Sequence, residues 1–331
     1  MKKNIHKQNL IDLYLKSFDD DIKYVNYFFD NFYKKKDCVS LYESGKCASA
    51  LHLVDKELSF LNVSIKCPYI FAASTMTEFR NQGYFSKVLK KTFEKLYKRG
   101  INLCALYPFE HSFYQKFGFA TVCYVKNTTL NFNGFVPKLN QAADADNLTG
   151  IYNEYFKNFD IYIKRNNKEM QKKIDECLVS GGELAVLDNS YVLYDKTGSE
   201  VVLNKKKTGA SAGLNGLNNF TVQTYSEKFD IPYTMVRIVN VRKMLMIIPY
   251  KCQKNSIKLK ITDEFYSRNN VTLEIKIKNN RAKVRNCKEY DEEISVFGLC
   301  LLVFGTYKSQ DFSKKLSDIF PKKKTYLIDQ I

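Results

Sequence analysis

The residues best suited to chemistry lie in one segment, where an arginine and a glycine separate a strand-like stretch from a helix-like one. The run Arg80-Asn81-Gln82-Gly83 follows the apolar stretch Tyr69–Thr75 and leads into the amphipathic stretch Gly83–Arg99. A turn of this kind leaves the first N–H groups of the helix without partners, beside the positive end of the helix dipole. Together with the charge of Arg80, these groups predict a main-chain cradle for a pyrophosphate. The same spacing also occurs in ordinary tight turns, so the flanking sequence must decide between the two interpretations.

The elements that must position this turn form a mixed unit of helices and strands. Phe85, Val88, Leu89, Phe93, Leu96 and Tyr97 form one apolar stripe of Gly83–Arg99, and lysines occupy the other face. Around it the periodicity predicts helical segments at Asp21–Tyr33 and Glu110–Lys116, and strands at Cys38–Glu43, Cys47–Val54, Leu58–Lys66, Tyr69–Thr75, Ile101–Leu106 and Phe119–Lys126. These elements predict an α+β domain over residues 1–133.

The rest of the chain repeats such signals twice. Residues 134–231 predict two helices, Asn147–Phe159 and Lys168–Val179, then short strands at Glu183–Leu187, Tyr191–Tyr194 and Val201–Leu203. This is similar to a shorter copy of the first domain. Residues 232–331 predict a third α+β unit, with strands at Tyr233–Val241, Ser256–Ile261 and Val271–Ile277 and helices at Ile294–Val303 and Phe312–Ile319.

Composition limits the classes of protein to which the chain can belong. With 331 residues, 45% hydrophobic and 26% charged, it is a folded protein of two or three domains. The nine cysteines include no CxxC pair, which favours reduced thiols, and the polar start is not typical of a secretory signal. The longest apolar stretch, Val296–Tyr307, is shorter than the roughly 20 residues of a membrane-spanning helix, so we expect a cytoplasmic protein.

The net charge of +17 raises nucleic acid, anionic membrane and anionic cofactors as partners. The lysine runs at 34–36, 205–207 and 322–324 lie far apart in the sequence, which favours solvated surface over a nucleic-acid site. The three histidines include no HExxH motif, and we expect His52 and His111 to be packed or to face solvent.

The segment Tyr69–Phe119 resembles the acyl-CoA-binding region of the GCN5-related N-acetyltransferases (GNAT). The resemblance rests on R/Q-x-x-G-x-G/A at Arg80 to Phe85 and on FYQKFGF at Phe113–Phe119. Phe85 stands where most of the superfamily has Gly or Ala, and the Eis-like branch tolerates a bulky residue there. That branch implies tandem acetyltransferase domains, the second degenerate, followed by a sterol-carrier-protein-like domain. The stretches Met235–Val241 and Val296–Gly305 look like parts of that last domain.

The resemblance also implies roles for individual residues. Ala73, Ser74 and Thr75 would pair through their backbone with the pantetheine arm, and Arg80, Asn81, Gln82, Gly83, Tyr84, Phe85 and Ser86 would surround the pyrophosphate. Phe109 and Glu110 would touch the cofactor. Tyr114 would act as general acid, because a phenol with a pKa near 10 can give a proton to a thiolate leaving group.

The general base is less defined. The family branch implies the carboxylate of the last residue, Ile331, in a tail anchored by Tyr326, Leu327 and Ile328; a water chain and a frayed terminus remain alternatives.

We therefore expect an acetyl-CoA-dependent N-acetyltransferase, without a metal, that acts by direct attack in a ternary complex. The acceptor would be an aminoglycoside-like cationic amine or a lysine. A catalytically silent acyl-CoA-binding or lipid-binding module is the alternative. The acceptor pocket should hold carboxylates, for which the candidates are Asp19, Asp20, Asp21, Glu43, Glu110 and Asp291-Glu292-Glu293. The branch also implies a homo-oligomer, with a hexamer among the expected forms.

Overall fold

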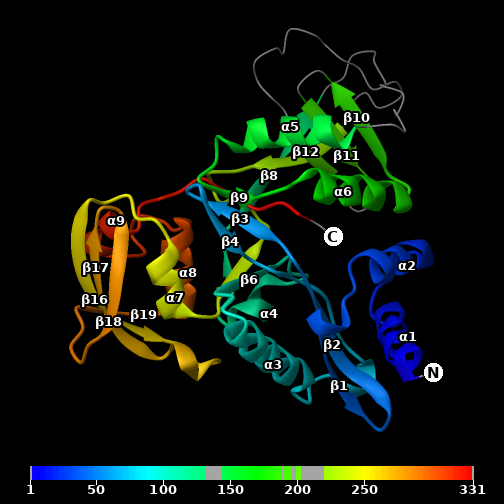
Figure 1. The fold of residues 1–331 in the computed structure, drawn as a ribbon, viewed down its shortest axis with the longest axis horizontal. Coiled ribbons are helices and arrows are strands. Elements are labelled where there is room, and N and C mark those ends of the chain that lie inside the picture. The colour runs from blue at the N-terminus through cyan, green and yellow to red at the C-terminus, as the bar shows by residue number, and fades with distance from the viewer. Residues whose placement is uncertain (1, 131–143, 188–189, 195–198, 203–219, 330–331) are drawn as a thin grey trace.

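The computed structural model describes residues 2–130, 144–187, 190–194, 199–202 and 220–329 (Figure 1). Its first part combines a mixed sheet with helices on both faces. The helices are α1 (Lys2–Leu15), α2 (Ile22–Asn31), α3 (Tyr84–Lys98) and α4 (His111–Gln115); the strands are β1 (Cys38–Glu43), β2 (Lys46–Val54), β5 (Tyr69–Thr75), β6 (Leu103–Leu106), β7 (Ala120–Thr121) and β15 (Met235–Ile238). The sheet order is β1-β2-β5-β6-β15-β7.

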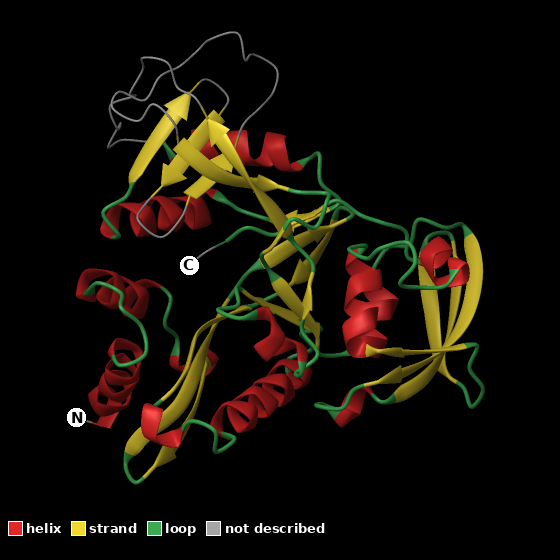
Figure 2. Ribbon diagram, turned by 180° about the vertical axis from the view of Figure 1, so that it is seen from behind, coloured by secondary structure: helices red, strands yellow, loops and turns green. Residues whose placement is uncertain are grey.

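Two hydrophobic cores lie on opposite faces of this sheet, and alternating residues of β2 contribute to one or the other. Leu51 and Leu53 pack with the buried stripe of α3, whereas Ala50 and Val54 pack with α1 and α2. Figure 2 shows α3 on one side of the β1–β2 ribbon and the two N-terminal helices on the other. The strands predicted at Cys38–Glu43 and Cys47–Val54 are confirmed and form a hairpin, with a turn at Ser44-Gly45 where both residues have positive φ. The predicted helix from Gly83 to Arg99 is also confirmed, with those two residues as its caps.

Two predicted strands are each split in the structure. Leu58–Lys66 is a hairpin of β3 (Glu57–Phe60) and β4 (Val63–Lys66), because Leu61 and Asn62 adopt φ of 47° and 67°. Leucine is not a typical residue for such a turn, so the alternating pattern of Leu58–Lys66 predicted one continuous strand. Phe119–Lys126 divides into β7 and β8 (Tyr124–Leu130), which pairs with β13 (Phe220–Tyr225) and β14 (Ile231–Pro232).

The stretch predicted to open the third domain instead contributes to the first sheet. Met235–Ile238 forms β15, which pairs antiparallel with both β6 and β7. The prediction was wrong about this location, since periodicity identifies a strand but not the partner with which it pairs. The division at residues 133 and 231, the degenerate second copy and the sterol-carrier-like unit stay predictions.

The middle part holds α5 (Ala145–Phe156) and α6 (Asn167–Val179) beside a sheet of β10 (Glu183–Leu187), β11 (Ser190–Tyr194) and β12 (Ser199–Val202). The third part holds α7 (Val241–Ile247), α8 (Val296–Phe304) and α9 (Lys314–Ile319) with β16 (Lys254–Thr262), β17 (Val271–Lys278), β18 (Arg281–Asn286) and β19 (Glu292–Ser295). Where the structure describes the chain, no helix is long and apolar enough to cross a membrane.

A small sheet joins the three parts. Its order is β20-β9-β3-β4, and it combines β3 and β4 of the first part with β9 (Ile161–Ile163) of the middle part and β20 (Thr325–Tyr326) of the tail. The largest hydrophobic core runs continuously from Leu58 to Ile328 through this junction. The tail is therefore part of the packed interior and not an appendage.

Candidate active site

The strands β5 and β6 part from one another beside the predicted site. They pair only at Tyr69 and Ala105 within the described residues, with the Ala105 N–H donating to Pro68 O at 3.1 Å. On its other edge β5 continues to pair with β2, where Ala72, at φ 47°, forms a bulge opposite Leu51. The edge of β5 that faces β6 is thus left open from residue 70 to residue 75. Ala73, Ser74 and Thr75, predicted to pair with pantetheine, lie on this open edge.

The loop after β5 leads into an N-terminus of α3 that has no side-chain cap. Asn81 and Gly83 both have positive φ, and Gly83 is the N-cap of α3 with no side-chain hydrogen bond to the helix. A Cβ on Gly83 would meet no atom within 4 Å, so its glycine is needed for the backbone angle and not for packing space. The first amides of α3, those of Tyr84, Phe85 and Ser86, have no partner within the helix. This arrangement matches an anion site at a helix N-terminus.

Side chains of the loop are held by its own backbone. Arg80 is exposed, and its Nε donates to Thr75 O at 3.2 Å, which keeps the guanidinium at the end of β5. The Gln82 amide donates to Glu78 O at 2.8 Å. The guanidinium therefore lies at the end of the open strand edge, in the loop that precedes the first amides of α3.

The side chains of Tyr84 and Phe85 have different neighbours. The Tyr84 hydroxyl donates to Glu43 at 2.9 Å, and this hydrogen bond raises the pKa of Tyr84. The Phe85 ring packs at 5.4 Å from the rings of both Phe113 and Phe117. Phe85 thus fills the space between α3 and α4, which explains how a bulky residue fits where the motif usually has a small one.

Tyr114 lies in this aromatic cluster at the end of α4. Its side chain is 4% exposed, its ring lies 6.1 Å from that of Phe85, and burial raises the pKa of Tyr114 to about 12. Among the described residues, none forms a hydrogen bond with its hydroxyl. Phe109, at 77% exposure, packs against Tyr114 at 5.7 Å. Glu110 uses its carboxylate to cap α4, accepting from the N–H and the hydroxyl of Ser112 at 3.1 and 3.0 Å, which lowers its pKa.

The last residues of the chain run into the junction of the three parts. Ile331, the predicted base, lies outside the described residues. Tyr326, Leu327 and Ile328 are buried, as predicted. The Leu327 N–H donates to the Cys123 Sγ at 3.3 Å, and its carbonyl accepts from the Thr234 hydroxyl.

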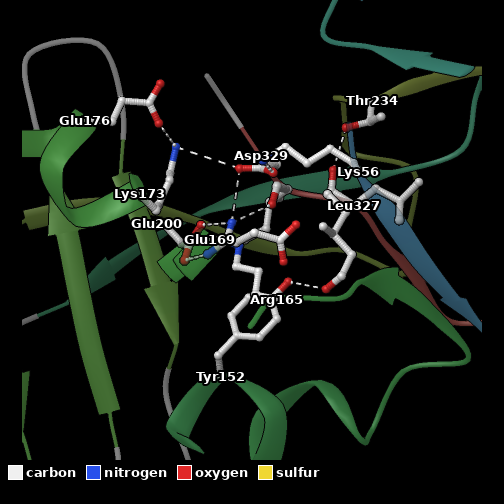
Figure 3. A network of polar contacts seen from close by, with 12 residues as sticks. Lys56, Tyr152, Arg165, Glu169, Lys173, Glu176, Glu200, Thr234, Leu327 and Asp329 are labelled. Carbon is white, nitrogen blue, oxygen red and sulfur yellow. Dashed lines mark hydrogen bonds and ion pairs between the residues drawn. The ribbon is translucent and has the colours of Figure 1, made fainter. Parts of the chain in front are cut away.

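A buried ionic cluster that sequence reasoning missed surrounds Asp329 (Figure 3). Its members are three cations and three carboxylates with side chains at most 14% exposed: Lys56, Arg165, Lys173, Glu176, Glu200 and Asp329. Arg165 binds Glu200 bidentately at 2.5 and 2.7 Å and approaches Asp329 at 3.3 Å. Lys173 and Glu176 are neighbours on α6, but the other members come from separate segments, so only the fold brings the cluster together.

Several of the carboxylates predicted to line an acceptor pocket have local partners. Asp20 accepts from the Tyr14 hydroxyl at 2.6 Å and Asp21 caps α2. Asp291 and Glu293, in the third part, pair with Lys315 and Lys260.

His52 is buried against the rings of Phe28, Phe29 and Tyr33, and burial lowers its pKa to about 3. His111 contacts the Thr121 hydroxyl at 2.9 Å.

Comparison with known proteins defines the class of the first part. Residues 5–122 match the family model of the acetyltransferase (GNAT) domain, so this segment is a GNAT-type domain. A search of curated proteins found no match.

Solved structures extend the likeness of fold to the whole chain. A conserved protein of unknown function from Enterococcus faecalis V583, described as a probable N-acyltransferase, superposes with a TM-score of 0.82 at 16% identity, covering 98% of this chain and 97% of that one. A GCN5-related N-acetyltransferase from Anabaena variabilis gives 0.74 at 16% identity, covering 99% and 97%. Eis1 from Mycobacterium abscessus gives 0.73 at 10% identity, covering 97% and 96%. At these identities the likeness is one of fold.

Proposed function

We propose that the protein is an acetyl-CoA-dependent N-acetyltransferase that acetylates a primary amine of a cationic, aminoglycoside-like molecule or of a lysine. The observation that carries this proposal is the open edge of β5 beside the uncapped N-terminus of α3. The pantetheine arm resembles a peptide, so it would add to the edge at Ala73–Thr75. The amides of residues 81–86, with Arg80, would surround the pyrophosphate.

The reaction would proceed by direct attack in a ternary complex. The neutral amine attacks the thioester carbonyl, the C–N bond forms, and the C–S bond breaks as the tetrahedral centre collapses. Tyr114 supplies the proton that the departing CoA thiolate needs, because its buried phenol is protonated throughout the neutral range. A base takes the proton that the amine loses.

For this base we propose the C-terminal carboxylate of Ile331. The support is the path of the tail, which is buried up to Asp329 and contacts Thr234 and Cys123. Burial is the main cause of the raised pKa of Tyr69, the residue at which β5 and β6 part, and the Asp329 charge contributes. Two residues of extended chain span at most about 7 Å, so the proposal requires the reacting amine to come within about that distance of Asp329.

The test is release of free CoA thiol from acetyl-CoA over a panel of aminoglycosides, polyamines and lysine peptides, with calorimetry for acetyl-CoA binding. We expect binding and release with at least one class of amine. Binding without release from any amine would instead favour the silent acyl-CoA-binding module, and no binding would overturn the proposal. Residues fused after Ile331 should lower turnover but leave acetyl-CoA binding intact.

A further inference from the structure

A single buried arginine links the third part of the chain to the turn that follows α4. Arg237, on β15, is fully buried. Its Nε donates to Phe117 O at 2.8 Å, and its Nη1 donates to Ile238 O at 2.6 Å. Its Nη2 donates to the carboxylate of Asp263, the residue that directly follows β16. The three nitrogens of one guanidinium therefore bind the turn after α4, β15 itself and the third part.

The Asp263 carboxylate is held at both of its oxygens. Its Oδ1 accepts from the Tyr266 N–H at 2.9 Å, and its Oδ2, which binds Arg237, also accepts from the Asn269 side-chain amide at 2.9 Å. The Asp263 side chain is 1% exposed, so its ion pair with Arg237 is shielded from water. A charge-assisted pair of this kind has a defined geometry, and removal of one partner leaves the other buried and unpaired. Residues of the third part therefore determine where the Arg237 guanidinium lies.

The carbonyl that Arg237 binds lies three residues after Tyr114. The N–H of Phe117 donates to Tyr114 O at 3.0 Å, and the N–H of Phe119 donates to the same carbonyl at 3.4 Å. The Phe119 ring lies 5.9 Å from the Tyr114 ring. Arg237 thus holds a residue whose own N–H is bonded to the Tyr114 backbone. Because Tyr114 belongs to a helix of only 5 residues, a shift of the turn that follows should move its phenol.

We propose that Arg237 is a positioning residue, which holds the turn after α4 so that the Tyr114 hydroxyl can reach the departing thiolate, and that Asp263 keeps Arg237 in place. This inference rests on the proposed function. Both residues are buried and act only through the turn. The third part would thereby contribute to catalysis in the first part without lining its site. Displacement of a reacting group by about 1 Å can lower a rate by about 10²-fold, so loss of this support should affect turnover.

The decisive variant is Asp263→Asn, because an amide nitrogen cannot accept the hydrogen bonds that a carboxylate oxygen accepts. We expect kcat to fall about 10- to 100-fold, while the acetyl-CoA dissociation constant changes less than about 3-fold, because the loop at residues 80–86 is not altered. The matched control is Asp37→Asn, since Asp37 is also a buried carboxylate, paired with Arg99 at the far end of α3. It should leave kcat within about 3-fold of the unchanged protein.

A double-variant cycle separates positioning of the phenol from a general loss of structure. In Tyr114→Phe the hydroxyl is absent, so adding Asp263→Asn should lower the remaining turnover less than about 3-fold. A purely structural defect would lower turnover by the same factor in both backgrounds. Hydrogen exchange of the peptide covering residues 111–119 should also be faster in Asp263→Asn and not in Asp37→Asn.

A second variant covers the case in which an unpaired Arg237 prevents folding. Arg237→Met combined with Asp263→Asn removes both charges together and places an apolar side chain at position 237. The Phe117 carbonyl loses its donor in this variant, so kcat should fall by at least the same factor as in Asp263→Asn. A cooperative urea transition establishes that each variant is folded before its kcat is compared.

The outcomes distinguish this inference from the proposed function. If the unchanged protein releases no CoA with any amine, the proposed function fails and the positioning role fails with it. If the unchanged protein is active and the folded variants retain its kcat, or lose the same factor in the Tyr114→Phe background, only the positioning role is overturned. Exchange of residues 111–119 no faster than in the control would also overturn it, because the turn would not depend on Asp263.

Discussion

At the scale of single residues, the general acid that we propose, Tyr114, is packed in an aromatic cluster. The motif FYQKFGF led to the prediction of a role for this tyrosine, and Phe85, the unusual residue of the neighbouring motif, packs in the same cluster. The ionic partners of Asp329 could not be predicted in this way. An isolated lysine or glutamate in a sequence is expected to be solvent-exposed, and only tertiary structure reveals that these side chains are buried together.

Tyr114→Phe should lower kcat by about 10²- to 10⁴-fold while acetyl-CoA still binds, because a general acid is removed without loss of the ring packing. Burial raises the pKa of Tyr114 from 10.0 to about 12, so the phenol keeps its proton at every pH below 10. Between pH 7 and pH 9, therefore, kcat in the unchanged protein should not fall through ionisation of this residue. Steady-state kinetics across this range provides the measurement.

The control for this change is Tyr290→Phe, at an exposed position in the third part. Equal loss of kcat in both variants would indicate a general effect on the fold. Full turnover in Tyr114→Phe would remove the phenol from the mechanism.

At the scale of elements, the local sequence pattern predicts which helices and strands form but not which partners they pack or pair with. The apolar stripe of α3 was sufficient to predict that helix, and the periodicity was sufficient to predict the two strands of the β1–β2 hairpin. The partner of β15 was not predictable, because its neighbours β6 and β7 lie more than a hundred residues earlier in the chain. Gly118, in the motif FYQKFGF, shows how a contact with a distant segment can require glycine at one position. It has φ of 79°, and a Cβ there would lie 2.9 Å from Arg237 Nε and from Val296 Cγ1.

Gly118→Ala should destabilise the protein by about 2 to 4 kcal/mol, which combines left-handed strain with overpacking against the buried Arg237. Urea unfolding provides the measurement. Gly45→Ala is the matched comparison, since Gly45 shares the φ of 79° but a Cβ there would meet no atom within 4 Å. It should cost about 1 to 2 kcal/mol from strain alone. Equal losses at the two positions would show that the contact with Arg237 does not matter.

At the scale of the whole molecule, the tail links the three parts through one shared core and one ionic cluster. The family resemblance implied that the apolar residues before the C-terminus anchor the tail, and these residues are buried. It could not predict the network that receives them, whose cations come from residues 56, 165 and 173. This network makes the stability of the junction dependent on pH.

Burial alone would raise the pKa of Asp329, but Lys56, Arg165 and Lys173 lower it to about 2 from 3.8. A carboxylate with a lowered pKa stabilises the fold above its unfolded pKa, and this contribution is lost as the pH falls from about 4 to 2. Asp329→Asn should therefore cost about 2 kcal/mol at pH 7 and much less near pH 2. Urea midpoints of both proteins at several pH values provide the measurement. A difference that stays constant down to pH 2 would contradict the assignment.

The position of β15 also bears on how the protein is made. The ribosome synthesises the chain from its N-terminus. The strands β6 and β7 therefore emerge well before residues 235–238, which form the strand between them. Until then the nascent first domain carries unpaired strand edges, which are templates for aggregation. Its sheet can close only after the middle part has been synthesised, and we therefore expect translation speed and chaperone binding over that interval to affect the yield of active protein.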